Sequence, residues 1–147
     1  MIPFPELKAF QDWAENDSDK ILFTVPDGEV YELLRVYCLY IADAKSQDDR
    51  QLVLQIRDTA GVVVLSAIMG DVISQGETWY VTWAPMLPLI EDETGLKKAL
   101  IPLPNPTLIP TGFSVRVFDI NAVLPADDDM YLDAVVSRDQ PGPDPLP

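Results

Sequence analysis

The sequence predicts an all-β fold, an antiparallel β-sandwich built from short strands. Beyond residue 20, apolar side chains recur with the period of two that strands require, and no later stretch has helical spacing. Turn residues separate these runs, and one opening occurs twice, as Pro26-Asp27-Gly28 and as Pro110-Thr111-Gly112. Eight or so strands without intervening helices favour a jelly roll. An immunoglobulin-like sandwich is the alternative, although the two cysteines and the tryptophan of that fold are missing at their usual spacing.

The chain of 147 residues suits a single domain with three parts. Residues 1–19 are predicted to form an N-terminal arm with a short helix, because Leu7, Phe10 and Trp13 have helical spacing. Pro5 suits the first turn of that helix. Residues 20–138 would form the β-sandwich. Residues 139–147 carry four prolines and are predicted to be an extended tail that meets a partner.

The sandwich begins with a brief strand at 21–25 and a long strand at 29–42. The long strand is apolar at both parities. One predicted face carries Leu34, Val36, Cys38 and Tyr40, and the other carries Leu33, Tyr37, Leu39 and Ile41. Both faces of this strand must therefore be covered.

A hairpin follows, with strands at 52–57 and 62–68 joined by the turn residues 58–61. In the next strand Trp79, Val81 and Trp83 share one face. The stretch from Pro85 to Leu108 contains five prolines, which cannot donate to a sheet ladder, so it is predicted to be a long loop or an edge excursion. Two final strands are predicted at 113–120 and 130–136.

The charge balance is strongly acidic, with 24 acidic against 10 basic residues, no histidine and a formal net charge of -14. Such a surface repels phosphates, so we expect no nucleic-acid partner. The charge is typical of a surface that keeps a rather apolar protein in solution, and specific cation binding is the alternative. Neither a signal peptide nor an apolar run of roughly 18 to 20 residues is present, so we expect synthesis in the cytoplasm and no membrane partner.

The residue types argue against catalysis. Without histidine the chain lacks the commonest metal ligand and the commonest general base, and Cys38 lies in an apolar run typical of a buried small side chain. We therefore predict a protein that is not an enzyme and has no cofactor. The acidic clusters, which are Asp43 with residues 48–49, residues 91–93 and residues 127–129, lack the spacing of an EF-hand. For Asp127 to Asp129 the preferred interpretation is a solvated loop, and the alternatives are a cation site or a cap on the turn into the last strand.

Aromatic residues allow two interpretations. A carbohydrate-stacking platform is one, and core packing is the preferred one because Trp79 and Trp83 alternate in phase with Val81. The residues concerned are Trp79, Tyr80, Trp83, Phe113, Phe118 and Tyr131.

Three segments carry a resemblance to a known class. They are VPDGEVYELLRVY, RQLVLQIRDTAGVVV and LIPTGFSVRVFDINAVLPADDDMYLDAVV. Together they resemble the small head-associated structural proteins of tailed bacteriophages, which include capsid decoration or cement proteins. The resemblance covers about residues 20–137 and rests on a pattern of turns and strands. It implies a jelly-roll-like, often trimeric protein on the exterior of a capsid.

The expected function is therefore that of a virion structural protein, which bridges neighbouring major capsid protein subunits and forms a homo-oligomer, with a trimer favoured. The expected contact residues come from the arm, the proline-containing stretch and the tail. They are Phe4, Leu7, Phe10, Trp13, Pro85, Met86, Leu87, Leu89 and Leu146. The alternative is a carbohydrate- or receptor-binding module of a phage tail or fibre, which would use the tryptophan face or the proline-containing stretch. A calcium-dependent adhesion domain is a third hypothesis.

Overall fold

A computed structural model describes residues 6–13, 19–45, 48–86, 90–91, 97–121 and 128–138. The regular structure in these ranges is entirely β, which confirms the all-β prediction. The strands are β1 (Glu6–Asp12), β2 (Asp19–Thr24), β3 (Tyr31–Ile41), β4 (Leu52–Arg57), β5 (Val63–Ile68), β6 (Thr78–Pro85), β7 (Ile90–Glu91), β8 (Lys98–Leu103), β9 (Leu108–Ile109), β10 (Ser114–Asp119) and β11 (Asp129–Arg138). Within the described ranges there is no helix of the length and apolar character needed to cross a membrane.

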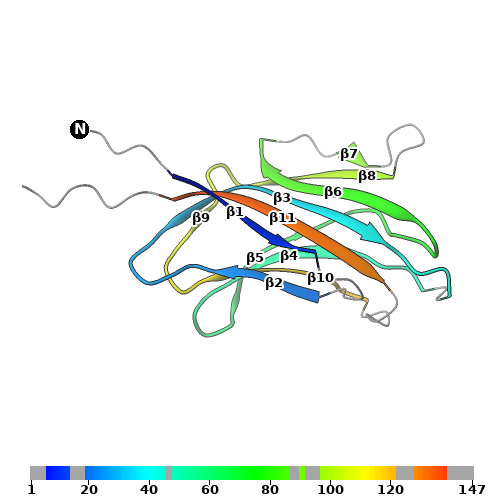
Figure 1. Cartoon of the computed structure of the whole chain (residues 1–147), viewed down its shortest axis with the longest axis horizontal. Coiled ribbons are helices and arrows are strands. Elements are labelled where there is room, and N and C mark those ends of the chain that lie inside the picture. Colours follow the sequence, from blue (N-terminus) through cyan, green and yellow to red (C-terminus); the bar gives the residue numbers. More distant parts are fainter. Residues whose placement is uncertain are drawn as a thin grey trace, which may run out of the picture.

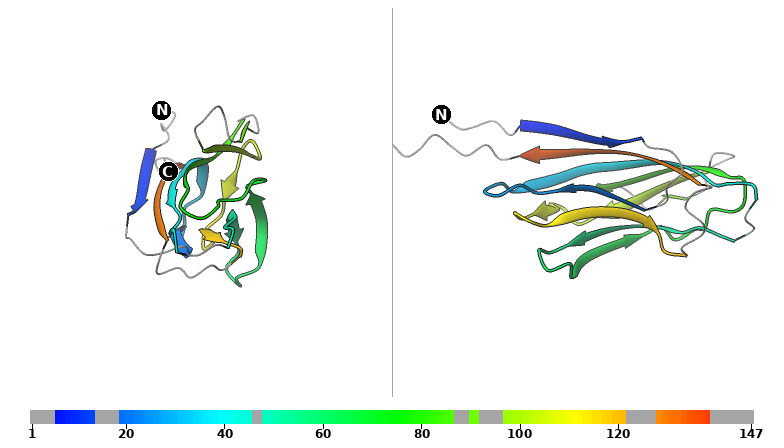
Figure 2. Two further views of the ribbon diagram at one scale, coloured as in Figure 1. Left: turned by 90° about the vertical axis from the view of Figure 1, so that its right-hand side faces the viewer. Right: turned by 60° about the horizontal axis from the view of Figure 1, so that its bottom comes forward.

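The strands form two sheets that pack as the two layers of a sandwich (Figures 1 and 2). Sheet A has the order β1-β11-β3-β6-β8-β7, with β9 paired to β3 as well. Sheet B has the order β2-β10-β4-β5. The pairing is antiparallel except between β6 and β8, which run parallel, so the predicted fully antiparallel sandwich needs that one correction.

The strand pairs are nested along the chain. Among them β1 pairs with β11, β2 with β10, β3 with β6, and β4 with β5. The β4–β5 hairpin forms the tip of this arrangement, as the sequence predicts. Its turn is closed by a hydrogen bond from the Asp58 amide to the Val62 carbonyl (2.9 Å), and Gly61 has a φ of 82° that side chains disfavour.

The predicted N-terminal helix is wrong, because residues 6–12 form the edge strand β1 against β11. Phe10 lies on the inner face of this strand, where its ring stacks on Phe23 with centroids 4.6 Å apart. Leu7 and Trp13 lie at the alternate, exposed positions. The spacing of three between Leu7, Phe10 and Trp13 fits a helix, and in a strand the same spacing places Phe10 on the face opposite Leu7 and Trp13. Pairing with β11 along the whole length of β1 satisfies one side of its backbone, and this tertiary contact decides the structure.

The two predicted faces of the long strand also need a correction. Between Arg35 and Leu33 the pairing to β11 skips Leu34, which is the extra residue of a β-bulge. The bulge changes the phase of the alternation, so that Leu33 and Val36 are both buried in the core although their parities differ. Beyond the bulge the prediction holds, with Cys38 inside and Tyr37 on the other face.

The described part of the stretch from Pro85 to Leu108 contains a strand that the expectation of a long loop or edge excursion did not include. Residues 98–103 form β8, and Ala99, Ile101 and Leu103 alternate as its buried side chains. Prolines at 102 and 104 obscured this strand in the sequence. Pro102 is tolerated because it lies near the margin of sheet A, where β7 pairs only with residues 99 and 100.

The core fills the space between the two sheets. Trp79 and Trp83 are its largest side chains, with 1% and 0% exposure, and the Trp83 indole donates a hydrogen bond to the Ala67 carbonyl at 2.9 Å. Cys38 is also fully buried. The core-packing interpretation of the two tryptophans is therefore confirmed, and the tryptophan face offered for carbohydrate stacking is not accessible.

Candidate functional site

The outer face of sheet A carries a row of apolar and aromatic side chains across its central strands. Register places Tyr131 of β11 opposite Leu39 of β3, and Leu39 opposite Tyr80 of β6. The next row places Asp133 opposite Tyr37. Among the described residues, sheet B covers only the inner face of sheet A. The outward side chains of β3 are therefore covered only by other side chains of the same outer face.

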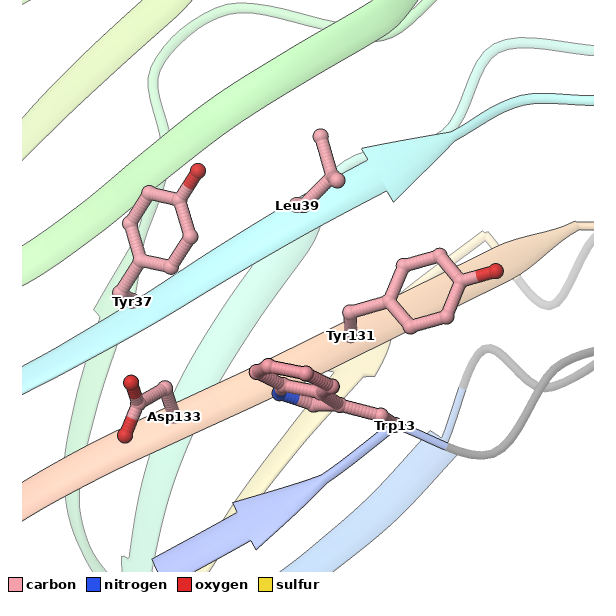
Figure 3. A pocket seen from close by; sticks show the side chains of 5 residues that line it. All are labelled: Trp13, Tyr37, Leu39, Tyr131 and Asp133. Carbon is pink, nitrogen blue, oxygen red and sulfur yellow. The ribbon is translucent and has the colours of Figure 1, made fainter. Parts of the chain in front are cut away.

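Part of the row surrounds a hollow of about 270 Å³, which we call the aromatic pocket. Its lining residues are Trp13, Tyr37, Leu39, Tyr131 and Asp133. Figure 3 shows Tyr37 and Leu39 projecting from β3, and Tyr131 and Asp133 projecting from β11. The Trp13 indole reaches over β11 between these last two side chains. Two central strands and the residue that follows β1 therefore position the whole lining.

The aromatic pocket combines ring surfaces with one carboxylate. Burial is the main cause that raises the pKa of Tyr37, so this phenol stays neutral at physiological pH. Asp133 contributes the single acidic group of the lining, on a protein with a net charge of -14. The site therefore offers π faces and a negative charge. Neither Tyr37 nor Asp133 was singled out as a site residue by the sequence, because alternation shows which residues share a face but not which face stays open.

A second apolar surface lies at the margin of sheet B. There β5 pairs with β4 on one side and is the last strand of the sheet. Val62, Val63, Val64 and Ile68, which we call the edge patch, are between 42% and 58% exposed. Residues 62–68 contain no charged residue and no proline, two common protections of an exposed edge, and the pairing with β4 skips Val64 in a β-bulge. The run of three valines in the sequence is the signal that would have identified this surface.

A hollow of about 190 Å³ adjoins the edge patch. Val64 lines it together with Pro104, Pro106 and Leu108, and Leu108 is itself 58% exposed. The apolar surface therefore continues from β5 onto the segment that leads into β9.

A buried ion pair joins distant parts of the chain at one end of the sandwich. Arg50 donates through Nε to Asp128 Oδ2 and through Nη2 to Asp128 Oδ1, both at 2.9 Å, and neither side chain is exposed. The Tyr40 hydroxyl and the Asp43 amide donate to the same carboxylate. Arg50 also donates to the Asp48 carbonyl at 2.8 Å. The solvated-loop interpretation is therefore wrong for Asp128.

Electrostatics hold this cluster in its charged form. Burial by itself would raise the pKa of Asp128, but hydrogen bonds from Arg50, the Asp43 amide and Tyr40 outweigh it, so that the pKa lies below the usual value. Burial, followed by the hydrogen bond to Asp128, raises the pKa of Tyr40. The side chains of Arg50 and Asp128 are fully buried, and Tyr40 and Arg50 both bond to the Asp128 carboxylate, which indicates a structural role.

The structure separates the predicted contact residues. Leu7 and Trp13 are exposed at opposite ends of β1, whereas Phe10 packs inward. Pro85 ends β6, and Met86 after it is 81% exposed with a φ of 64°. Phe4, Leu87, Leu89 and Leu146 lie outside the described residues, as do residues 92–93, Asp127 and the proline-rich tail. Of the predicted set, only Trp13 lines the aromatic pocket.

The described ranges contain no group of three or more histidine, cysteine, aspartate or glutamate side chains placed to hold a metal ion. Comparison with known proteins adds no assignment. No protein-family model matches the chain, and no curated protein sequence matches it.

Proposed function

We propose that this chain is a non-enzymatic structural protein that decorates a phage capsid and stabilises it by bridging neighbouring major capsid protein subunits. The observation that carries the proposal is the edge patch, a run of exposed apolar residues on an edge strand that has no charged residue and no proline. Such an edge presents unpaired N–H and C=O groups beside apolar side chains, so it favours strand addition by another chain. Contact through β5 would remove the unpaired backbone groups and the apolar side chains from water.

The charge of the chain is consistent with a position outside the shell. A net charge of -14 is unfavourable next to packaged DNA, and it costs less on the exterior. The same charge opposes unspecific association of the apolar edge. We therefore expect β5 to meet a surface that matches it in shape and backbone pairing.

We infer that the sandwich is a jelly roll. A long hairpin that is wrapped into two four-stranded layers produces a nested set of strand pairs. This sandwich has such a set, with the pairs β1–β11, β2–β10, β3–β6 and β4–β5. In this view β7, β8 and β9 are additions between β6 and β10. Jelly rolls serve in viral capsids and in lectins alike, so this fold is compatible with the proposed role but does not carry it.

Two of the edge strands, β1 and β5, suggest how a trimer would form. The edge strand β1 of sheet A contacts β2, whereas the edge strand β5 of sheet B contacts β8, so the two edges lie on opposite flanks of the sandwich. Pairing of β5 in one copy with β1 in the next is heterologous and closes into a ring of three when each step turns by a third of a circle. Leu7, exposed on β1, would then lie in this contact.

Light scattering coupled to size-exclusion chromatography tests the assembly step. We expect the native chain to elute as three copies of the 16.4 kDa protomer, and Val64→Lys in the edge patch to give monomers. Val30→Lys is the matched control, because Val30 is also exposed but lies outside β5, and it should leave the trimer intact. A native chain that is monomeric at all concentrations would contradict the assembly proposal.

Binding to empty capsids of the source phage tests the capsid role. We expect cosedimentation with the capsids, a raised temperature of capsid rupture, and added density on the exterior by electron microscopy. Val64→Lys should lower the occupancy, since trimerisation multiplies weak single contacts. Absence of the chain from the capsid surface would refute this role.

A further inference from the structure

The aromatic pocket has a composition that selects for one kind of ligand. Its walls are the rings of Trp13, Tyr37 and Tyr131 and the alkyl side chain of Leu39, and its single charge is the Asp133 carboxylate. The hollow of about 270 Å³ lies at the lower end of ligand-site volumes and suits a small head group.

Ring faces and a carboxylate attract the same partner. The face of an aromatic ring carries the negative part of its quadrupole, so a cation above it is stabilised, and this effect grows as water is removed. Figure 3 shows rings on two sides of the hollow, with Asp133 beside the Trp13 indole. A cation seated between them would contact several rings and approach the carboxylate. The net charge of -14 further raises the local concentration of cations.

The lining discriminates between kinds of cation. A primary ammonium is strongly hydrated and needs an acceptor for each of its three N–H donors, whereas this lining supplies one carboxylate and mainly ring and alkyl surface. A quaternary ammonium has no N–H donor and presents methyl groups. It loses no hydrogen bond on entering and fills the hollow with apolar contact while keeping its positive charge.

We propose that the aromatic pocket binds a quaternary ammonium group, such as the trimethylammonium head of a choline-bearing molecule. Trp13, Tyr37 and Tyr131 supply the ring faces, Leu39 supplies apolar contact and Asp133 supplies the counter-charge. The pocket lies on the outer face of sheet A, whereas the proposed trimer contact runs along the edges of β5 and β1. Trp13 follows β1, but the other four lining residues lie on β3 and β11, so choline titration and light scattering test the two proposals separately.

Calorimetric titration of the full chain with choline, tetramethylammonium and 3,3-dimethyl-1-butanol tests the proposal. The last compound is the uncharged carbon analogue of choline, so it isolates the contribution of the charge. We expect choline to bind at least about tenfold more tightly than this analogue, as ring and carboxylate attraction together imply. Choline methyl protons should shift upfield in NMR spectra, because ring currents act on groups held against aromatic faces.

Variants assign the effect to named residues. Asp133→Asn should weaken choline binding at least about fivefold and leave the analogue unaffected, whereas Trp13→Ala should weaken both. Tyr80→Ala is the matched control, since Tyr80 is an exposed tyrosine in the same row that does not line the pocket, and it should change nothing. Circular dichroism and melting confirm that each variant is folded. Fluorescence gives a second readout, because Trp79 and Trp83 are buried and Trp13 is 62% exposed.

Equal binding of choline and its uncharged analogue would overturn the proposal in favour of an apolar docking site. Binding of oligosaccharides without binding of tetramethylammonium would overturn it in favour of carbohydrate recognition. Choline binding that persists in both Trp13→Ala and Asp133→Asn would place the site elsewhere and would also overturn it.

Discussion

Replacing Asp128 by asparagine tests whether the buried ion pair holds the end of the sandwich together. The substitution keeps the size of the side chain but leaves the Arg50 guanidinium, which has no exposed side-chain surface, without its counter-charge. Removing one partner of a buried pair costs about 3 to 5 kcal/mol in free energy of unfolding. A domain of this size is stable by about 5 to 15 kcal/mol, so the loss is a large fraction of the total. The melting temperature should fall by about 6 to 20 °C.

Urea denaturation followed by tryptophan fluorescence measures this loss, because Trp79 and Trp83 report on the core. Asp129→Asn is the neighbouring control, and its half-buried position in β11 predicts a smaller effect. The double variant Arg50→Met with Asp128→Asn should be more stable than Asp128→Asn alone, since no unpaired charge remains. An Asp128→Asn protein within about 1 kcal/mol of the native chain would refute the reasoning.

The pH dependence of the same pair has a definite sign. The folded-state pKa of Asp128 lies below the ordinary value of 3.8, so the folded state favours the carboxylate. The stabilisation is therefore complete above the unfolded pKa and is lost as pH falls through the lower, folded pKa. Acid titrations of stability should show a shallower loss in Asp128→Asn than in the native chain.

Three further predictions concern single positions. In urea denaturation, Gly112→Ala should lower the stability more than Gly28→Ala. Both glycines have a positive φ, but only a Cβ at position 112 would come within 2.4 Å of Thr59 Cγ2. Thr59→Ala should therefore remove the difference between the two variants. Cys38 should resist thiol reagents in the native protein and react once it is unfolded, because burial raises its pKa. Burial, helped by the neighbouring Glu29 carboxylate, raises the pKa of Tyr31 to about 12, so stability should fall between pH 10 and 12, and Tyr31→Phe should reduce that loss.

The sequence identified those parts of the fold that depend on local chemistry. The β4–β5 hairpin was predictable because Asp58 to Gly61 specify its turn, and the burial of Trp79 and Trp83 followed from their alternation with Val81. The spacing of Leu7 and Phe10 could not distinguish a helix from an edge strand.

Features that join distant segments were beyond such reasoning. Arg50 and Asp128 are 78 residues apart, and nothing in either neighbourhood indicates that they pair. The bulge at Leu34 depends on the register with β11, so the phase change it causes in β3 cannot be read from β3 alone. The same holds for the aromatic pocket, because strand order and register bring Tyr37 and Tyr131 into adjacent rows of one outer face, which no sheet in the described part of the chain covers.

The apolar second face of β3 links these observations. A strand that is apolar on both sides needs cover on both, and in this protein sheet B covers only the inner side. On the outer side Trp13 reaches across β11 toward Tyr131, which shelters part of the row and leaves the hollow that these two side chains line with Tyr37, Leu39 and Asp133. Replacing Trp13 should therefore change ligand binding at the pocket far more than it changes the stability of the core. The edge strand β1 thus has two separable roles, since its inward Phe10 packs in the core while the outward Trp13 that follows it shapes a surface site.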